Sequence, residues 1–489
     1  MSRSLVRMPN DFSILGDRLP AASFGQGERI PIMGMHMDES DEEYSDALEK
    51  GQHERAPAAS EGGVKTRHIH VKSISKIEGH GSLDIAIDGS KVKYVKLKIT
   101  ESKRFYTQAI RGKFAISLPL MTSRICGTCS IAHLTCCAEA VEDALEYTPT
   151  DQTLLLRKLS LYGMMIRDHA LHLFLFCLPD LFGKDSVLDF EPPEDEMIKK
   201  AFAIKSAGNN LSKVIAGRAI HATFAEVGKF SHIPDQNSVK EVLKELKSVR
   251  DYAIEFIDIF YNCQFKLERD IAFVSLLTDD YSFLGGTVID SNGEEISRTN
   301  YWDYLQKVII PYSQATGYSF EGKEFMVGAL ARMNLNKKSL HTQTKKDVQK
   351  YASAFPSKNI FHNNLAQAIE ILHCIDHSIE LLESNEFKEE TNEPVVIKEG
   401  DGVGMLGAPR GTLFYALSID KAGMVKYGNI IVPTQQNQIA MEKSVVQLVE
   451  ENIDQSRAKI EYEIEKLIRA YDPCMSCASH FLRINWTSR

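Results

Sequence analysis

The sequence predicts a mainly α fold of the α+β class: a bundle of long helices with a small antiparallel sheet near its N-terminal end. In residues 66–100, hydrophobic and polar residues alternate on both sides of a Gly-Ser turn, as they do in half-buried strands. Later segments instead carry apolar residues every three or four positions, the period of a helix with one buried face. These segments are 154–178, 239–263, 365–382 and 441–470.

The order of these segments predicts one ordered domain between two tails. Residues 1–64 contain an acidic run and an Ala-, Pro- and Gly-rich stretch with little periodicity, so we expect a disordered acidic extension there. Residues 65–480 hold all the periodic segments. The last predicted helix stops before Asp472-Pro473, because proline cannot continue a helix, and residues 481–489 form a short C-terminal tail.

Composition bounds the class of protein. A chain of 489 residues with a net charge of −9 suits a large buried core and argues against a nucleic-acid surface, which needs clustered Lys and Arg. No charge-free apolar stretch is long enough for a membrane span, and residues 1–7 lack the apolar segment of a secretory signal. The chain has nine cysteines, four of them in two Cys-x-x-Cys pairs. The other five show no regular spacing of the kind that indicates a disulfide framework, which favours a reducing compartment. We expect a cytoplasmic protein, with export on a partner's signal left open.

Two Cys-x-x-Cys pairs lie near opposite ends of the ordered region: Cys126 with Cys129, and Cys474 with Cys477. Each pair can hold one soft metal through both sulfurs, so two pairs make a complete tetrathiolate site for nickel, iron, zinc or copper(I). In a structural zinc knot, such pairs are separated by about 15 to 20 residues. Here most of the protein lies between them, which favours a buried centre assembled by the finished fold, with structural zinc as the alternative.

The residues around both pairs resemble the two signature motifs of the large subunit of nickel-iron hydrogenases. The first reads Arg-Ile-Cys-Gly-Thr-Cys-Ser-Ile-Ala-His from Arg124 to His133, and the second Asp-Pro-Cys-Met-Ser-Cys-Ala-Ser-His from Asp472 to His480. The resemblance covers residues 66–480. It implies the large-subunit fold and an oxidoreductase that interconverts H2 with protons and electrons.

The same resemblance implies the cofactor, a nickel-iron centre whose iron carries carbon monoxide and cyanide ligands. All four cysteines would bind nickel, with Cys126 and Cys474 terminal. Cys129 and Cys477 would also bridge to the iron. Composition alone could not indicate the diatomic ligands.

Four further residues resemble family positions around this centre. Glu78, in Ser-Lys-Ile-Glu-Gly-His, matches a glutamate that passes the proton away from a terminal thiolate. Arg410, in Ala-Pro-Arg-Gly, matches an arginine above the open metal position, where its fixed fork of donors can bind a cyanide nitrogen. Asp168 matches the carboxylate that pairs with this arginine, and Thr434 a hydroxyl donor to the other cyanide. Without the resemblance, Glu78 would read as a solvated loop carboxylate and Asp168 as part of a polar stripe on a core helix.

Several positions depart from the family pattern. Thr107 stands where relatives carry a glutamate that helps to hold a Mg or Fe ion, and a neutral hydroxyl is a poor ligand for a hard dication. His480 keeps its place as a candidate ligand of that accessory ion, but Thr107 argues against it. Gly407 replaces a glutamate, Ala222 a proline, and Lys76 an arginine. We therefore expect proton and ion networks that differ around an unchanged nickel-iron core.

A second motif points elsewhere. Residues 402–407 spell Gly-x-Gly-x-x-Gly after a strand-like segment, as in a dinucleotide-binding fold. In that fold the glycines open a helix, whereas here Ala-Pro-Arg-Gly follows at once and would halt one. We expect no nucleotide site in this chain, so that nicotinamide or flavin chemistry would belong to a partner.

The number of cysteines also bears on the partners of this chain. Once the two pairs are used, too few cysteines remain to bind a chain of iron-sulfur clusters. The resemblance therefore implies an iron-sulfur small subunit, further electron-transfer subunits, nickel chaperones and a maturation protease that would cut after His480. Segment 166–180 looks like that of the cytoplasmic multimeric group. The alternatives are a quinone-binding homologue, which would lack the four cysteines, a zinc-stabilised binding protein, and a hydrogen sensor that uses the same site.

Overall fold

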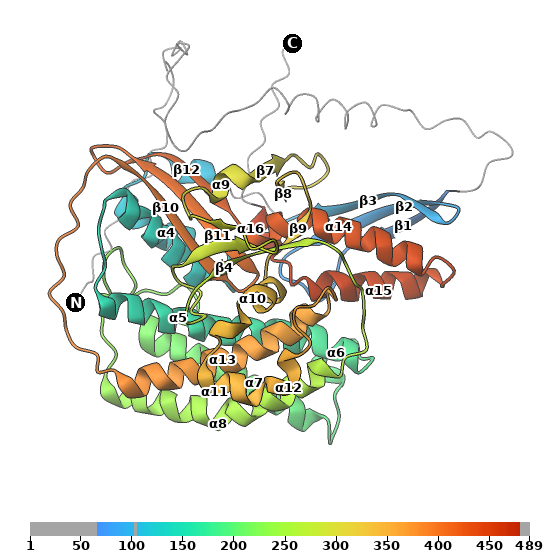
Figure 1. Ribbon diagram of the computed structural model, residues 1–489, viewed down its shortest axis with the longest axis horizontal. Helices are drawn as coiled ribbons and strands as arrows, with labels where there is room; N and C mark the ends of the chain where they lie inside the picture. Colours follow the sequence, from blue (N-terminus) through green and yellow to red (C-terminus); the bar gives the residue numbers. More distant parts are fainter. Residues whose placement is uncertain (1–65, 102–104, 480–489) are drawn as a thin grey trace, which may run out of the picture.

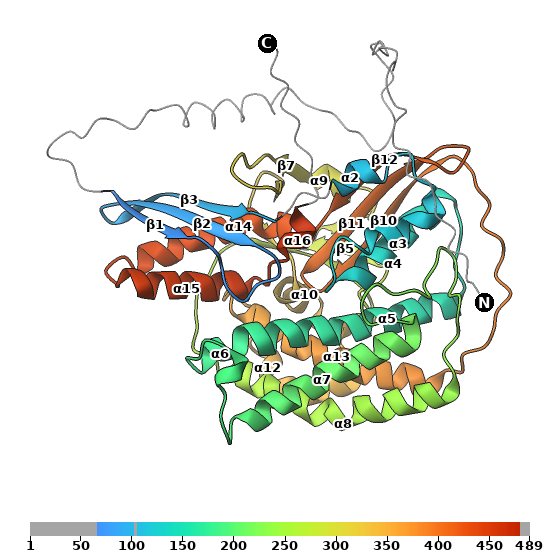
Figure 2. The ribbon, with the colours of Figure 1, turned by 180° about the vertical axis from the view of Figure 1, so that it is seen from behind.

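The computed structural model describes residues 66–101 and 105–479 (Figures 1 and 2). Both predicted tails, and with them His480, lie outside the described residues. The described chain is a mainly α fold with small antiparallel sheets, so the predicted fold class is confirmed.

Four long helices form the lower layer of Figure 1. They contact one another in the cyclic order α5, α7, α8 and α13. Apolar residues at three- and four-residue spacing provide the buried faces, as Val239, Val242, Leu246 and Val249 do in α8. The bundle consists of α5 (Asp151–Ala170), α7 (Asp195–Ala216), α8 (Gln236–Tyr261) and α13 (His362–Ser384).

The helix predicted at 154–178 changes its winding before it ends. After α5 the chain continues as a π-helical segment, Leu171–Cys177, and then as the short α6 (Leu178–Leu181). Such wider turns are rare and often lie at functional sites. This one directly follows Asp168 and His169, which are buried at the end of α5.

The predicted N-terminal sheet is confirmed as three antiparallel strands, β1 (Arg67–Val71), β2 (Gly81–Asp88) and β3 (Lys91–Ile99). A two-residue turn joins β2 to β3. The sheet lies beside α14 (Pro433–Glu451) in both ribbon views, and the backbone N–H of Leu97 donates to the carboxylate of Glu442 at 2.8 Å.

The prediction of one helix over 441–470 is wrong. The structure has two, α14 and α15 (Arg457–Ala470), with a break at 452–456. Ser456 starts the second, because its side chain accepts a hydrogen bond from the backbone N–H of Lys459 at 3.3 Å and caps the new N-terminus. The helix does stop before Asp472-Pro473, as the sequence indicated.

A central sheet that the sequence did not predict contains the Gly-x-Gly-x-x-Gly motif. Its antiparallel strands are β10 (Gly400–Ala408), β11 (Gly411–Ile419) and β12 (Val425–Ile431), and α4 (Ser130–Ala144) packs on β10 and β11. A Cβ on Gly402 would lie 2.2 Å from the Ala140 carbonyl oxygen, and one on Gly404 would lie 2.0 Å from that of Cys136. The motif therefore opens no helix; its glycines allow a helix to lie against the strand.

The remaining elements link these layers. A mixed sheet in the order β6-β5-β4-β9 and a two-stranded β7-β8 ribbon pack with the central sheet around a second apolar core. These strands are β4 (Ala272–Leu277), β5 (Thr287–Asp290), β6 (Glu295–Ile296), β7 (Leu305–Val308), β8 (Gly317–Phe320) and β9 (Phe325–Met326). The short helices are α2 (Tyr106–Ala109), α3 (Leu118–Thr122), α9 (Tyr301–Tyr304), α10 (Ala329–Asn336), α11 (Thr342–Asp347), α12 (Gln349–Ala352) and α16 (Met475–Ala478). Across the described ranges, we find no helix with both the length and the apolarity that a membrane span needs.

Candidate metal centre

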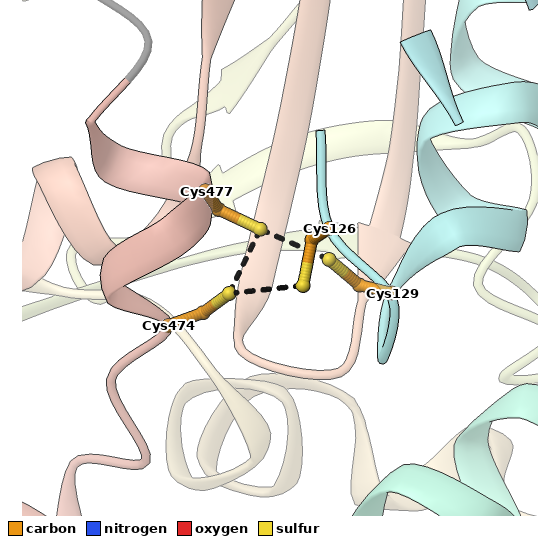
Figure 3. A group of neighbouring side chains, drawn as sticks. All are labelled: Cys126, Cys129, Cys474 and Cys477. Atoms are coloured by element: carbon orange, nitrogen blue, oxygen red, sulfur yellow. Dashed lines mark hydrogen bonds between the residues drawn. The ribbon is translucent and has the colours of Figure 1, made fainter. Parts of the chain in front are cut away.

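Four cysteine sulfurs meet where α4, the central sheet and the end of α15 come together. The Sγ atoms of Cys126, Cys129, Cys474 and Cys477 all lie within 4.8 Å of one another, and all four residues are buried. Figure 3 shows the two pairs approaching from opposite sides with their sulfurs facing. The Sγ–Sγ distance is 3.4 Å from Cys126 to Cys474 and 3.0 Å from Cys129 to Cys477. The fold thus joins two pairs that are 348 residues apart in the chain.

The first pair lies in the loop that leads into α4. Cys129 immediately precedes Ser130, the first residue of the helix. One turn later, His133 places its Nε2 3.4 Å from the Sγ of Cys477, and the Tyr415 hydroxyl on β11 fixes the other ring nitrogen at 2.8 Å. The rigid helix therefore positions a thiol ligand and a hydrogen-bonding imidazole together.

The second pair is joined to the Glu-Gly-His segment through the backbone. Cys474 and Glu78 form a short parallel bridge, and the Met475 N–H donates to the Glu78 carbonyl at 2.9 Å. Gly79 has φ of 78°, and a Cβ there would lie 2.9 Å from the Met475 Cβ. Only glycine fits between these two segments.

The Glu78 side chain turns toward the cysteines. Its Oε2 accepts from the Cys474 thiol at 3.0 Å and from the Ser476 N–H at 3.1 Å. Burial raises the pKa of Glu78, and the charge of Cys126 adds to this, against the hydrogen bonds from Cys474 and Ser476 that lower it. Glu78 is therefore not the solvated loop carboxylate that its sequence context alone would indicate.

Arg410 lies at the tip of the β10–β11 hairpin, where Ala408 pairs with Gly411. Its guanidinium is bound between two carboxylates, that of Asp168 at 2.9 Å and that of Asp472 at 2.9 Å. Burial opposes the charge of Arg410, but the two carboxylates raise its pKa well above the usual value. The predicted pairing of Asp168 with Arg410 is observed.

Asp472 is a site residue that sequence reasoning took only for part of a helix stop. Its backbone adopts φ of 52°, and its carboxylate binds Arg410 on one side and the Gln367 amide, at 2.8 Å, on the other. Its place two residues before Cys474 was the available signal.

A second group of residues that holds the β10–β11 hairpin was also not predicted from the sequence. Arg332 donates to the backbone carbonyls of Ala408 at 2.9 Å and Pro409 at 3.0 Å, and Glu370 on α13 binds this guanidinium at 2.7 Å. Gln367 and Glu370 are three residues apart and therefore share one face of α13. Polar residues at helical spacing in an apolar helix were the signal for this face.

Thr434 lies in the first turn of α14, beside the second pair. Its hydroxyl accepts from the Cys474 N–H at 2.9 Å, which leaves the hydroxyl proton to be donated elsewhere. The sequence singled out this residue, and the structure places it against a cysteine ligand.

The positions that depart from the family pattern are spread over the structure. Thr107 is half-buried in α2, and Gly407 lies in β10, where an added Cβ would lie 3.2 Å from the Phe283 side chain. Lys76 binds the Asp180 carboxylate at 2.7 Å. Ala222 is buried. None of them is among the four residues of the cluster.

The chemistry of the four thiols fits a bound cation. Hydrogen bonds from neighbouring thiols hold the pKa of Cys126 well below its usual value, whereas burial raises those of Cys474 and Cys477 well above it. Hydrogen bonding to Cys126 raises the pKa of Cys129 to about 11. Like charges in one buried site disfavour each other, so four thiolates can coexist there only around metal ions. Soft sulfur donors select metals such as nickel and iron.

Comparisons with known proteins identify the family. The model of the family described as "Nickel-dependent hydrogenase" matches residues 107–216 and 290–480, which is more than half of the chain. The chain belongs to the nickel-dependent hydrogenase family. It is 32% identical to sulfhydrogenase 2 subunit alpha of Pyrococcus furiosus over 85% of this chain and 100% of that protein. It is 28% identical to the NAD-reducing hydrogenase HoxS subunit beta of Cupriavidus necator, over 85% of this chain and 95% of that one.

Solved structures of hydrogenases share the fold. An NAD+-reducing [NiFe]-hydrogenase in the H2-reduced state superposes with a TM-score of 0.76 at 24% identity, over 85% of this chain and 100% of that chain. The Ni-Fe-Se hydrogenase of D. vulgaris Hildenborough gives 0.70 at 19% identity, over 85% of this chain and all of that one. The predicted family, fold and hydrogenase activity are confirmed, and the buried four-cysteine cluster fits a nickel-iron centre.

Proposed function

We propose that this chain converts H2 reversibly into two protons and two electrons at a nickel-iron centre, as the catalytic subunit of a larger complex. The observation that carries the proposal is the buried four-sulfur cluster with a carboxylate 3.0 Å from one of its thiols. All four cysteines would hold nickel, with Cys129 and Cys477 bridging to an iron that carries carbon monoxide and cyanide. When bound by these four cysteines, such a centre would supply the redox chemistry of H2 cleavage.

The chain's own residues handle the proton. Glu78 reaches the thiol of Cys474 directly, within the distance that proton transfer needs. The Ser476 N–H holds the carboxylate in that position. Glu78 is therefore the group that takes a proton from the Cys474 side of the site.

Arg410 and Thr434 frame the same site from other elements. Arg410 is kept charged by Asp168 and Asp472, so it presents fixed donors toward the centre. Thr434 has a hydroxyl proton to donate, and we assign these two residues to the two cyanide ligands.

Electrons must leave through a partner. In the parts of the chain that the structure describes, the four cysteines form the one group of three or more Cys, His, Asp or Glu side chains suited to a metal. We propose an iron-sulfur small subunit, further electron-transfer subunits and a cytoplasmic location, in keeping with relatives named as subunits of NAD-reducing and sulfur-linked hydrogenases. Nickel chaperones and a protease that cuts after His480 belong to the same proposal. So does the expectation that Thr107 weakens the accessory Mg or Fe site at His480.

The deciding experiment is infrared spectroscopy of the anaerobically purified complex, with nickel and iron quantitation. One carbon monoxide band, two cyanide bands and about one nickel per chain are expected, because four thiolates hold a single dinuclear centre. Zinc without those bands, in protein made with its maturation machinery, would contradict the proposal.

The role of Glu78 has its own test. Glu78→Gln keeps the acceptor oxygen for the Ser476 N–H but cannot accept a proton, so nickel should be retained while deuterium–proton exchange falls about a hundredfold. Glu389→Gln, on an exposed carboxylate outside the cluster, is the control. An exchange rate equal to that of the wild type would return Glu78 to a purely structural role.

A further inference from the structure

A line of buried hydrogen bonds leads from the π-helical segment to Arg410. His172 Nδ1 lies 2.6 Å from the Gln367 Oε1, Gln367 Nε2 lies 2.8 Å from the Asp472 Oδ2, and Asp472 Oδ1 lies 2.9 Å from Arg410. His172 and Gln367 are 1% and 0% exposed. The line joins three separate parts of the chain: the segment after α5, helix α13 and the loop before α16.

The direction of each hydrogen bond is fixed. Gln367 must donate its amide hydrogen to Asp472, because its oxygen would repel that carboxylate. Its Oε1 then faces His172, so His172 Nδ1 must carry a hydrogen. The other ring nitrogen lies 2.7 Å from the carbonyl oxygen of Arg469, with the Cys177 Sγ at 3.3 Å. Both ring nitrogens of His172 therefore have partners, which hold the ring in place against Gln367.

Several charged groups surround this line. Asp168 and Asp472 both bind the Arg410 guanidinium, and the charge of the buried Arg167 also acts on Asp168. His172 Nε2 lies 3.8 Å from the Asp472 Oδ1. The neighbouring Arg469 is bound by Asp180 instead, at 2.6 Å.

The π-helical segment places His172 in this line. His172 follows Asp168 by four residues, which is the spacing of one helix face, and the wider winding begins at Leu171, just before it. Asp168 and His172 therefore reach the same guanidinium, one directly and the other through Gln367 and Asp472.

We propose that His172 and Gln367 are positioning residues: they fix the Asp472 carboxylate and, through it, the orientation of the Arg410 guanidinium toward the metal centre. The inference rests on the proposed role of Arg410. Neither residue reaches the cluster itself; they act through the second carboxylate of Arg410 by holding the oxygen, Oδ2, that Arg410 does not bind.

The test uses Gln367→Leu in the whole complex, a substitution of similar volume that removes both hydrogen bonds. We expect shifted cyanide bands, unchanged nickel content and kcat lower by about ten- to a hundredfold, because small displacements of an oriented group cost about that much. KM for H2 should change less than about twofold, since substrate binding is untouched. Tyr162→Phe is the matched control, because it breaks another buried hydrogen bond to α13, that between Tyr162 on α5 and His377, outside this line.

A second substitution tests whether His172 and Gln367 both act through Asp472. His172→Phe should shift the same bands, and the double variant should lose no more than the more strongly affected single variant, because both residues act through Asp472. Additive losses would overturn the proposal. If Gln367→Leu does not fold, Gln367→Met replaces it.

The outcomes separate this inference from the proposed function. Wild-type bands and kcat in Gln367→Leu, with most activity lost in Arg410→Lys, would refute the positioning role and leave the proposed function standing. If the wild type lacks the bands, the proposed function fails. A crystal structure of Gln367→Leu then decides: an Arg410 guanidinium in its original place would refute the inference.

Discussion

The two cysteine pairs are held in the site by different means. The first is followed directly by α4, which lies against β10 with backbone in contact with backbone at Gly402 and Gly404. The second follows α15 and is fixed by polar contacts from distant segments, those of Glu78, Thr434 and Arg410. Core packing therefore dominates in the first half of the site, where the buried Arg167 also donates to the Thr128 carbonyl, and hydrogen bonds from distant segments hold the second half. Substitutions should affect overall stability on the first side and metal retention on the second.

The largest effect is expected on the second side. Cys474→Ser replaces a soft thiolate by a hydroxyl that binds nickel poorly, so nickel and hydrogen uptake should both fall to background. The melting temperature of the metal-free protein should hardly change, because the backbone bridge to Glu78 remains. Cys263→Ser, outside the cluster, is the control. Hydrogen uptake near that of the wild type in Cys474→Ser would remove the assignment of the centre.

On the first side, Gly404→Ala should destabilise the whole protein. Its Cβ would lie 2.0 Å from the Cys136 carbonyl oxygen, and backbone on both sides prevents an easy shift. We expect a loss of about 3 kcal/mol or more, seen in thermal unfolding. Gly407→Ala, on the same strand, meets Phe283 less closely, its side chain at 3.2 Å and its Cα at 3.4 Å, and should cost less than about 1 kcal/mol. Equal melting temperatures for the two variants would mean that α4 and β10 are not locked together.

A smaller effect is expected at Thr434. Thr434→Val keeps the shape but leaves the buried Cys474 N–H without its acceptor, at a cost of about 1 to 3 kcal/mol. The second pair should then release nickel to a chelator faster, and the melting temperature should fall less than in Gly404→Ala. Thr434→Ser retains the hydroxyl and should behave like the wild type. A fall in melting temperature as large as that of Gly404→Ala would erase the contrast between the two sides.

The last effect appears only at high pH and concerns Glu442 on α14, the helix that also carries Thr434. Burial raises the pKa of Glu442 to about 7, against the hydrogen bonds from Leu97 and Tyr312 that lower it. This raised pKa favours the folded state fully below about pH 4.5, and the contribution is lost as pH rises through about 7. Glu442→Gln should therefore melt like the wild type near pH 5 and be more stable by roughly 1 to 3 kcal/mol near pH 8. A difference between the two proteins that does not vary with pH would contradict this.

The sequence predicted those parts of the fold that have a regular period. Strands β1 to β3 alternate, and α5, α8 and α13 repeat every three or four residues. Helix α7 has the same period, with Ala201, Ile204 and Leu211 buried, but was not predicted. Strand β11 is buried at all nine positions, and its middle is the uninterrupted apolar run 413–417, which periodicity cannot separate from a buried helix. Strand β10 is rich in glycine because the backbone of α4 lies directly against it, so its sequence does not show the alternation of a typical strand.

The sequence also indicated the cysteines, Glu78, Arg410, Asp168 and Thr434, because short motifs carry them. Gln367, Glu370 and Arg332 carry no motif. Each acts across a contact between distant segments, and no local pattern shows which polar residue of a buried helix faces the site. The polar stripe on α13 was visible, but its target was not.

The separation of the two pairs also affects synthesis. Protein chains are made at about 5 to 20 residues per second, so the 348 residues between Cys126 and Cys474 correspond to about 20 to 70 seconds of translation. During that time the ribosome presents half a site: two neighbouring thiols without their partners. Such a pair can capture zinc or copper(I), so the order of metal delivery in the cell must respect the order in which the chain emerges.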